Sequence, residues 1–393
     1  SVTGFDKDKD RVNEINAGKQ VMKHISKEAM KNFVDNNGSA TTEFSVIGDM
    51  DCLIICVPTP LDEHEQPDMS YVERASSTIG RHLKKGQLVV LESTTYPGTT
   101  REIVKPILEK AKLEAGKDFF LAYSPEREDP GNKEFSVSKI PKVMGGFTSD
   151  CLKVTSALYK NIVSETVEVS SMETAEATKL MENIFRAVNI AMVNELKLVL
   201  DRMGVNIWEV VDAAKTKPFG FMPFYPGPGM GGHCIPIDPF YLSWKAKEHN
   251  TEAKFIELAG EVNRKMTENI THRISRALND HKKSVKDSKI MIVGVAYKKD
   301  IDDMRESPAL RIMELLDYKG AKVCYHDPYL KTVKSLKNTE LTKENIEMQD
   351  AIVITTDHTN VDYDLLAKHA KLIVDTRNRM ATVKNPKASI IRA

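Results

Sequence analysis

The sequence lacks both a long hydrophobic run and an excess of charge of either sign. None of its 393 residues belongs to an uninterrupted apolar segment of about 18 residues, the length that a membrane-spanning helix requires. Lysine plus arginine and aspartate plus glutamate both number 56, so the formal net charge is zero and no basic surface is expected. These absences argue against a membrane protein and against a nucleic-acid-binding protein.

Cysteine is scarce, and its spacing does not suit a metal site. The five cysteines are at positions 52, 56, 151, 234 and 324. No pair has CxxC spacing, so neither zinc nor another metal is expected. The sequence opens without a secretion signal, and an odd number of free thiols fits a reducing compartment. We therefore expect a cytoplasmic protein.

A glycine-rich phosphate-binding turn is also missing where one is expected. Residues 1–16 read as the end of a strand, then the acidic Asp6, then a helix that carries Arg11. In a dinucleotide-binding fold this is the second strand, whose terminal acid accepts hydrogen bonds from a ribose and favours NAD over NADP. A first strand with G-x-G-x-x-G should precede it by about 20 residues, so we expect a further segment upstream of Ser1. An ordinary exposed acid at a turn is the alternative for Asp6.

Strand and helix patterns alternate through the first part of the chain. Apolar strands are expected near residues 52–57, 87–91 and 119–123, and each ends in a polar cluster. The clusters contain Thr59, Thr94, Glu126 and Arg127. Because ligands bind at the carboxyl ends of parallel strands, these side chains are candidate site residues. Turns and helix caps use the same residue types, which is the alternative explanation.

The middle of the chain is helical, and the alternation returns after it. Helical apolar spacing from residue 172 to about 203 predicts one long helix, on which Lys179 and Asn183 share a face. An ordinary solvated helix face is the alternative explanation for these two polar residues. We predict an α/β protein with two Rossmann-like doubly wound parallel-sheet domains. The predicted domains are residues 1–170, a central helical region at 171–280 that also forms a homodimer interface, and residues 281–393.

A glycine- and proline-rich loop surrounds one cysteine. Residues 226–239, PGPGMGGHCIPIDP, place Cys234 among four glycines and four prolines. Glycine lets backbone N–H groups approach a ligand, and proline stiffens the remaining chain. We predict that Cys234 is a covalent nucleophile beside a phosphate-bearing substrate; a buried, inert cysteine is the alternative. His233 need not be its base, because adjacent side chains usually point apart. The predicted cradle consists of Gly227, Gly229, Gly231 and Gly232.

Further motifs accompany this loop in a fixed order. They are Cys56-Val-Pro-Thr-Pro, Glu92-Ser-Thr94, Ser124-Pro-Glu-Arg, Glu176-Ala-Thr-Lys179-x-x-x-Asn183, Tyr297-Lys298 with Asp302-Asp303-x-Arg305-x-Ser-Pro, and Asp375-Thr-Arg-Asn. Together they resemble the UDP-sugar 6-dehydrogenases over essentially the whole chain. Residues 216–229 look most similar to the UDP-N-acetylglucosamine enzymes, and UDP-N-acetylmannosamine and UDP-glucose stay open as substrates.

The resemblance implies a four-electron oxidation of a sugar C6 alcohol to a carboxylate with two NAD⁺, supplying surface polysaccharide precursors. Cys234 would attack the intermediate aldehyde to give a thiohemiacetal and then a thioester. Lys179 would be either the base or the electrostatic partner of the developing oxyanion, with Asn183 bonded to the same oxygen. Asp238 would orient or deprotonate the hydrolytic water, with Thr94 and Glu126 as helpers.

The resemblance also implies the binding residues. Those for NAD are Asp6, Arg11, Thr59, Thr94 and Arg305. Those for the UDP-sugar are Glu126, Arg127, Lys179, Asn183, Tyr225, Gly227, Gly229, Gly231, Gly232, Lys298 and Arg377. Three other functions stay open: a two-electron dehydrogenase, a cysteine hydrolase, and a nucleotide-sugar-binding scaffold without activity.

Overall fold

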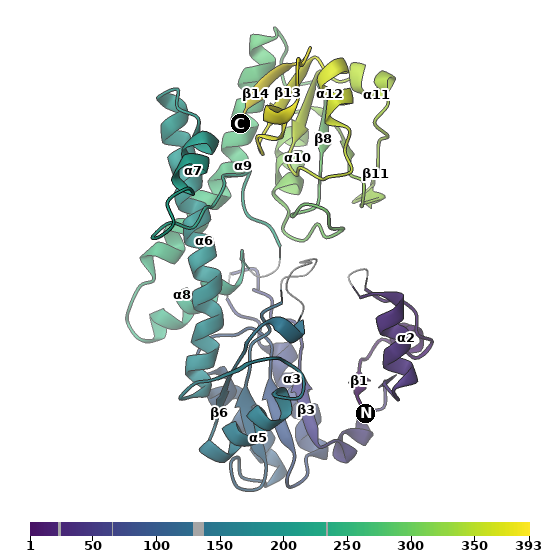
Figure 1. The fold of residues 1–393 in the computed structure, drawn as a ribbon, viewed down its shortest axis with the longest axis vertical. Helices are drawn as coiled ribbons and strands as arrows, with labels where there is room; N and C mark the ends of the chain where they lie inside the picture. Colours follow the sequence, from purple (N-terminus) through teal and green to yellow (C-terminus); the bar gives the residue numbers. More distant parts are fainter. Residues whose placement is uncertain (23–24, 65, 129–136, 233–234) are drawn as a thin grey trace. The chain divides into compact units, whose positions relative to one another are not determined.

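The structure is a computed structural model that describes residues 1–22, 25–64, 66–128, 137–232 and 235–393 (Figure 1). The chain divides into two compact units, Ser1–Met181 and Glu182–Ala393. The boundary falls inside the longest helix, α6 (Met172–Arg202). Within the described ranges, no helix is both long enough and apolar enough to cross a membrane.

The first unit is built on a five-stranded sheet with the order β3-β4-β5-β6-β7. The strands are β3 (Cys52–Ile55), β4 (Leu88–Leu91), β5 (Phe120–Tyr123), β6 (Lys142–Gly146) and β7 (Thr166–Glu168). The pairs are parallel except β5 with β6, which is antiparallel through Ala122 and Gly146. Two short strands, β1 (Thr3–Phe5) and β2 (Ser39–Thr41), pair in parallel beside it as a separate sheet.

Strand β4 is apolar throughout because both of its faces are covered. Leu88 and Val90 pack against helix α5 (Ser149–Tyr159), while Val89 and Leu91, which point the other way, are equally buried. Helix α3 (Ser70–His82) packs against strand β3 and against α4 (Lys105–Leu108). The remaining helices of this unit are α1 (Lys9–Asn16), α2 (Lys27–Asp35), η1 (Phe44–Asp49), the π-helical η2 (Thr100–Val104), η3 (Glu109–Ala111) and η4 (Val137–Lys139).

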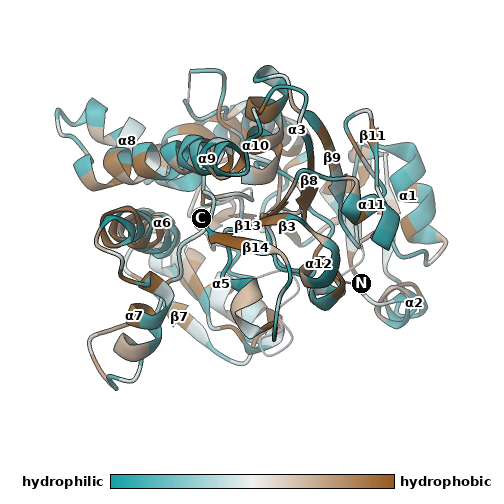
Figure 2. Cartoon of the chain, turned by 90° about the horizontal axis from the view of Figure 1, so that it is seen from above, coloured by the Kyte–Doolittle hydropathy of each residue, from teal (hydrophilic) through white to brown (hydrophobic). Residues whose placement is uncertain are grey.

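The second unit contains a fully parallel sheet with the order β14-β13-β12-β8-β9. Its strands are β8 (Lys289–Val293), β9 (Lys322–His326), β12 (Ala351–Ile354), β13 (Leu372–Asp375) and β14 (Ser389–Arg392). Side chains of β8 alternate between two cores: Ile290 and Ile292 join α9 (Lys254–Asp280) and α10 (Pro308–Tyr318), whereas Met291 and Val293 join the opposite core. Figure 2 shows β8 as mostly hydrophobic, as expected for a strand covered on both faces.

The opposite core of the second unit is closed by two shorter helices. These are α11 (Lys343–Glu347) and α12 (Tyr363–His369). The other elements are α7 (Ile207–Ala214), α8 (Asp238–Glu248), the hairpin of β10 (Thr332–Val333) and β11 (Leu336–Lys337), and η5 (Arg379–Thr382). The predicted α/β fold with parallel sheets and one long central helix is confirmed.

The chain turns at Gly294, directly after strand β8, toward residues 297 and 298. Gly294 has a φ of +82°, and a Cβ there would overlap the carbonyl oxygen of Thr356. We expect Gly294→Ala to lower the free energy of unfolding by about 2–4 kcal/mol. Urea unfolding followed by circular dichroism measures this loss.

Gly204→Ala is the matched control for this measurement. Gly204 has a similar φ of +73° but open space around its Cβ position. Its replacement should cost only about 1 kcal/mol, since only the backbone conformation is penalised. Equal losses in the two variants would show that the contact with Thr356 is unimportant.

Candidate active site

The carboxyl ends of strands β3 and β4 are joined by hydroxyl groups. The Thr59 hydroxyl donates to the carbonyl of Thr94 at 2.7 Å. The Ser93 hydroxyl donates to the carbonyl of Val57 at 2.7 Å and accepts from its N–H at 2.9 Å. Because parallel strands end at one edge of a sheet, the predicted residues Thr59 and Thr94 lie together there.

The acid after strand β1 lies beside the predicted arginine. Asp6 Oδ1 accepts from the N–H of Asp8 at 2.9 Å, and Asp6 Oδ2 is 3.7 Å from an Arg11 guanidinium nitrogen. Asp8 in turn caps helix α1, which fixes the position of Arg11 on the first turn. Asp6 is partly exposed, so its carboxylate can still accept hydrogen bonds from a ligand.

Glu126, on the loop after strand β5, is paired with a lysine that the sequence did not indicate. Lys142 Nζ lies 3.3 Å from Glu126 Oε2 and 3.1 Å from Glu92 Oε1. Burial raises the pKa of Glu126, but Lys142 and the backbone N–H groups of the next two residues outweigh it and hold the pKa below its ordinary value. Arg127 points elsewhere, since its guanidinium donates to the carbonyl of Pro141 at 2.7 Å.

Helix α6 fastens the loop that follows Thr94. The buried carboxylate of Glu176 accepts from the N–H of Gly98 at 2.6 Å and from the N–H and hydroxyl of Thr100 at 2.9 and 2.7 Å. Burial raises the pKa of Glu176 to about 7 against the effect of these hydrogen bonds. Lys179, also buried, follows one turn later on the helix. The sequence motif contained Glu176, but its role was not anticipated.

In the second unit, helix α6 meets the start of helix α8. The Asn183 amide donates to Asp238 Oδ2 at 2.6 Å, and both side chains are almost fully buried. The structure therefore brings these two predicted residues together. Cys234, the predicted nucleophile, and His233 lie outside the described residues.

Two buried asparagines hold the glycine loop from behind. Asn194 Oδ1 accepts from the N–H of Gly227 at 3.0 Å, and its amide donates to Asn263 Oδ1 at 2.9 Å. Sequence reasoning missed both residues. A signal existed, because Asn194 follows Asn183 by 11 positions, which is about three helical turns and therefore the same face.

The front of the glycine loop packs against the sheet edge of the second unit. A Cβ on Gly227 would lie 2.5 Å from an Arg377 guanidinium nitrogen, and one on Gly231 or Gly232 would lie 2.7 or 2.9 Å from Tyr297. The Gly232 N–H donates to the carbonyl of Arg305 at 2.9 Å. Glycine is therefore required at these three places by contact, and at Gly232, with a φ of +90°, by conformation as well.

A cation is built into this edge. Arg377 is half-buried, and its Nε donates to the carbonyl of Thr355 at 2.9 Å. Burial lowers the pKa of its guanidinium, while Asp357 and Asp375 act in the opposite direction. Lys298 lies next to Tyr297 and is half-exposed. Glycine N–H groups beside such cations suit the oxygens of a diphosphate.

Three further predicted residues contact other parts of the second unit. Arg305 forms an ion pair with Asp303, with a shortest distance of 2.7 Å. The Tyr225 hydroxyl donates to Asp212 of helix α7 at 2.7 Å and accepts from Lys215 at 3.1 Å, so it is held by that helix. Gly229, with a φ of +141°, lies against Pro308 and the carbonyl of Asn263.

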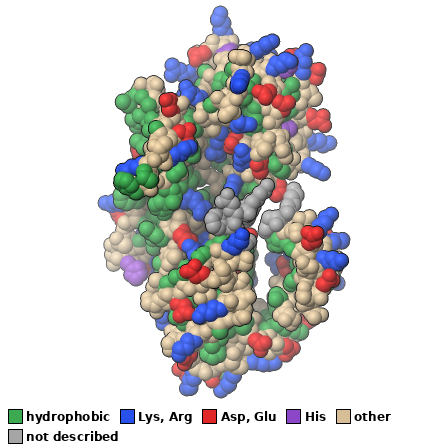
Figure 3. Space-filling model, viewed as in Figure 1, with side chains coloured by type: hydrophobic (Ala, Val, Ile, Leu, Met, Phe, Trp, Pro, Cys, Tyr) green, Lys and Arg blue, Asp and Glu red, His purple; other side chains and the backbone are tan. Residues whose placement is uncertain are grey.

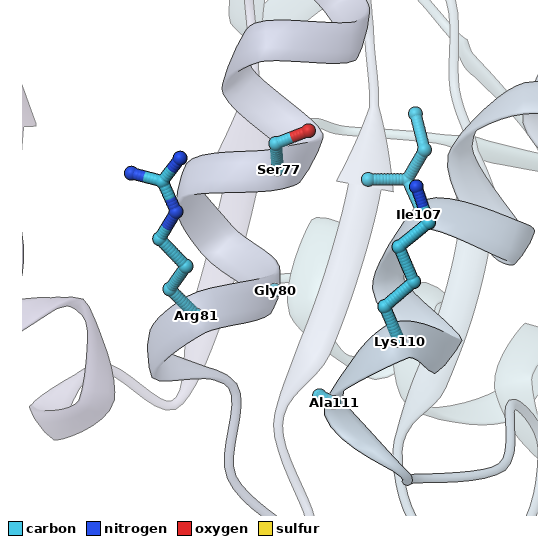
Figure 4. A pocket seen from close by; sticks show the side chains of 6 residues that line it. All are labelled: Ser77, Gly80, Arg81, Ile107, Lys110 and Ala111. Atoms are coloured by element: carbon cyan, nitrogen blue, oxygen red, sulfur yellow. The ribbon is translucent and has the colours of Figure 1, made fainter.

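A separate groove lies between helices of the first unit (Figure 4). It has a volume of about 310 Å³ and is lined by Ser77, Gly80, Arg81, Ile107, Lys110 and Ala111. None of the predicted site residues lines it. It lies on the helices α3, α4 and η3 and away from the strand ends, so it is not the candidate active site.

Strand-edge sites in two α/β units are typical of a dehydrogenase that binds two nucleotides. Known proteins agree. Residues 1–163, 173–265 and 291–382 match the NAD binding domain, the central domain and the UDP binding domain of the UDP-glucose/GDP-mannose dehydrogenase family. The chain belongs to this family, and it is an NAD-dependent UDP-sugar dehydrogenase.

Individual relatives are similar over nearly the whole chain. The UDP-N-acetyl-D-glucosamine 6-dehydrogenase of Pseudomonas aeruginosa is 34% identical over 364 residues, which cover 91% of this chain and 85% of the relative. The UDP-N-acetyl-D-mannosamine dehydrogenase of Pyrococcus horikoshii is 36% identical over 344 residues, which cover 86% of this chain and 79% of the relative. A solved structure of the UDP-D-ManNAc dehydrogenase of Pyrococcus horikoshii superimposes with a TM-score of 0.91 at 32% identity, covering 99% and 93%.

The described residues fit the adenosine end of NAD. Asp6 ends a parallel strand with a partly exposed carboxylate, the group that accepts hydrogen bonds from ribose hydroxyls. Thr59 and Thr94 line a neighbouring strand edge, where a dinucleotide would run. NAD, when bound, supplies the acceptor for a hydride.

The buried Glu176 generates a prediction about stability and pH. Its pKa is about 7 in the folded chain and 4.5 ordinarily, so its contribution is fully present below pH 4.5 and is lost as the pH rises through 7. The unfolding free energy of the native chain relative to Glu176→Gln should therefore fall between pH 4.5 and 8, by on the order of 3 kcal/mol at most. Denaturant unfolding at several pH values measures it.

Glu173→Gln, one turn earlier on the same helix, is the control. The pKa of Glu173 is held below its ordinary value, since hydrogen bonding and attraction by Arg101 exceed the opposing effect of burial. The unfolding free energy of the native chain relative to Glu173→Gln should therefore rise with pH over the acidic range, which is opposite to the change expected for Glu176→Gln. A flat difference for Glu176→Gln would contradict the expected effect of burial.

Proposed function

We propose that this dehydrogenase oxidises the C6 hydroxyl of a UDP-N-acetylhexosamine to a carboxylate in a four-electron reaction, with UDP-N-acetylglucosamine favoured. The observation that carries the proposal is the glycine loop at residues 226–232. It is fixed by Asn194 behind and lies against Arg377 in front, and it leads directly to Cys234. A rigid loop beside a cation is what a thiol nucleophile needs next to a bound diphosphate sugar.

The preference for UDP-N-acetylglucosamine has two supports. Residues 216–229 are most similar to the UDP-N-acetylglucosamine enzymes, and the relative from Pseudomonas aeruginosa carries that substrate in its name. Relatives named for UDP-N-acetylmannosamine are equally similar, so that sugar is the second candidate. UDP-glucose is the third candidate.

In the first oxidation, the C6 alcohol loses a hydride from carbon and a proton from oxygen. NAD⁺, when held at Asp6, Thr59 and Thr94, would supply the hydride acceptor for both oxidations. Lys179 either takes the hydroxyl proton itself or stabilises the oxyanion that forms. Asn183 follows Lys179 by four residues on helix α6, so its amide can donate to the same oxygen, and Asp238 fixes the orientation of that amide.

The thiol then holds the aldehyde. The Cys234 thiolate adds to the aldehyde carbon and gives a thiohemiacetal, whose oxygen takes up a proton. Loss of a second hydride and of that proton gives a thioester. Water adds to the thioester carbon and expels the thiolate, which leaves the carboxylate. Covalent attachment prevents escape of the aldehyde between the two oxidations.

Hydrolysis needs a positioned water. Asp238 can orient it or accept its proton, and the ionised Glu126 and the Thr94 hydroxyl assist. The depressed pKa of Glu126 keeps it an acceptor at neutral pH. We propose that the uronate product serves surface polysaccharide synthesis in the cytoplasm, where the free thiol stays reduced.

We also propose that the protein is a homodimer through helix α6. Exposed apolar residues of the helix follow a stripe with helical spacing, namely Phe185, Met192, Leu196 and Val199, and Met203 directly after the helix continues it. Helix α7 and the following segment add Val210, Phe219 and Met222, and Figure 3 shows hydrophobic side chains gathered there. An apolar surface of this extent is typical of an interface, and a second copy can supply the same stripe by symmetry.

The substrate is tested by offering the full-length protein UDP-N-acetylglucosamine, UDP-N-acetylmannosamine and UDP-glucose with NAD⁺. We expect two NADH per UDP-N-acetylglucosamine and a kcat/KM at least about tenfold above that for the other two sugars. Cys234→Ser is the control, and it should form no carboxylate while it binds the UDP-sugar normally.

The other outcomes separate the remaining functions. One NADH per sugar would favour a two-electron dehydrogenase. Sugar binding without turnover would favour a scaffold, and hydrolysis without NAD⁺ would favour a cysteine hydrolase. Carboxylate formation by Cys234→Ser at the parental rate would exclude the covalent mechanism.

The dimer is tested by Leu196→Glu, which places a charge in the middle of the apolar stripe. Sedimentation should show dimers of the native chain and mostly monomers of the variant, because a buried unpaired charge is costly. Tyr318→Glu, at an exposed aromatic on helix α10, is the control and should remain dimeric. A monomeric native chain would refute the proposal.

A further inference from the structure

A buried charge cluster lies at the strand ends of the first unit. Glu92 directly follows strand β4, Lys142 begins strand β6, and Tyr159 ends helix α5. The side chains of Lys142 and Glu92 are only 7% and 12% exposed. Glu126, from the loop after β5, is 45% exposed and reaches the same ammonium from the solvent side.

The cluster has one cation for two carboxylates. Lys142 Nζ is 3.1 Å from Glu92 and 3.3 Å from Glu126. The Tyr159 hydroxyl and, at 3.7 Å, the Cys56 thiol donate to Glu92. Burial next to Glu92 raises the pKa of Cys56 to about 12 and also raises that of Tyr159, so both are neutral donors at neutral pH. The cluster therefore carries a net charge of −1.

The geometry fixes the ammonium more firmly than the outer carboxylate. Glu92 directly follows strand β4 with a side chain that is mostly buried and is held by Tyr159, and Lys142 Nζ also lies 5.3 Å from the Tyr159 ring centroid. Glu126 is on a loop and has no such support from another side chain among the described residues except Lys142. The backbone N–H groups of Arg127 and Glu128 hold one oxygen of the outer carboxylate, the lysine holds the other, and the lysine is oriented by Glu92.

We propose that Lys142 is a positioning residue that holds the Glu126 carboxylate, ionised and correctly oriented, for its part in the reaction, and that Glu92 and Tyr159 hold Lys142. The role of Glu126 on the hydrolytic water rests on the proposed function. The groups that face Glu126 are Lys142 from β6 and, behind it, Glu92 from β4, Tyr159 from α5 and Cys56 from β3.

Two variants should shift the ionisation of Glu126 in opposite directions. Lys142→Met removes the cation and leaves two carboxylates facing each other, so Glu126 should protonate about one pH unit higher or more. Glu92→Gln removes the competing carboxylate and leaves Lys142 to Glu126 alone, so Glu126 should protonate at lower pH. A purely structural ion pair predicts loss of stability in both variants and no opposed shifts.

The experiment records kcat and kcat/KM from about pH 3.5 to 9 for the full-length protein with whichever UDP-sugar it oxidises, because the pKa of Glu126 lies below its ordinary value. The acidic limb that Glu126→Gln removes is assigned to Glu126. We expect this limb to move up in Lys142→Met, and a move of one pH unit costs about tenfold in rate at pH values below both positions of the limb. It should move down in Glu92→Gln and return to its native position in Lys142→Arg. Lys153→Met, at an exposed ion pair on helix α5, is the control.

A second readout does not depend on turnover. In protein labelled with ¹³C at the glutamate carboxyl, the resonance absent from Glu126→Gln reports the Glu126 titration directly. An unchanged titration in Lys142→Met, or shifts of the same sign in Lys142→Met and Glu92→Gln, would overturn the inference. Failure to oxidise any UDP-sugar would instead refute the proposed function, while the titration would still decide the role of Lys142.

Discussion

Helix α6 carries polar side chains on a buried face, and each of them must find a partner. An unpaired buried donor or acceptor costs on the order of 1–3 kcal/mol, so these contacts are strongly specified. The Glu176 carboxylate accepts hydrogen bonds from the backbone N–H groups of Gly98 and Thr100. The Asn183 amide donates to the Asp238 carboxylate, and the Asn194 side-chain oxygen accepts from the Gly227 N–H. In the first unit the helix thereby fixes the loop at Gly98 and Thr100, and in the second unit it fixes the start of helix α8 and the glycine loop.

The glycine loop shows how a loop can be fixed without side chains of its own. Its backbone bonds to Asn194 on one side, and its missing Cβ atoms admit Arg377 and Tyr297 on the other. Any larger residue at Gly227 would displace the guanidinium and so weaken the cationic edge. The N–H groups of Gly227 and Gly232 are both used to hold the loop. The absence of side chains therefore lets the loop be fixed by its backbone and brings the Arg377 guanidinium close to it.

The periodicity of the sequence predicts those features of the fold that lie within a single helix or strand. The apolar spacing of α6 and the buried strands such as β4 were predicted correctly, and the shared face of Asn183 extends to Asn194 by simple helical geometry. Strands β2 and β7 have only three residues each, too few to show a period. The contact of Lys142 with Glu92 depends on the antiparallel pairing of β6 with β5, and no local pattern encodes that pairing.

The described cysteines have surroundings that do not favour a reactive thiolate. A reactive thiolate needs a nearby cation or exposure to water. Burial raises the pKa of Cys52, Cys56 and Cys324, and the Cys151 sulfur is buried against helix and strand backbone. Cys52 and Cys56 are exposed, but their raised pKa values leave little thiolate at neutral pH, while Cys151 is buried and Cys324 is half-buried. Cys234 alone follows a glycine- and proline-rich segment in the sequence, which is why we propose it as the nucleophile.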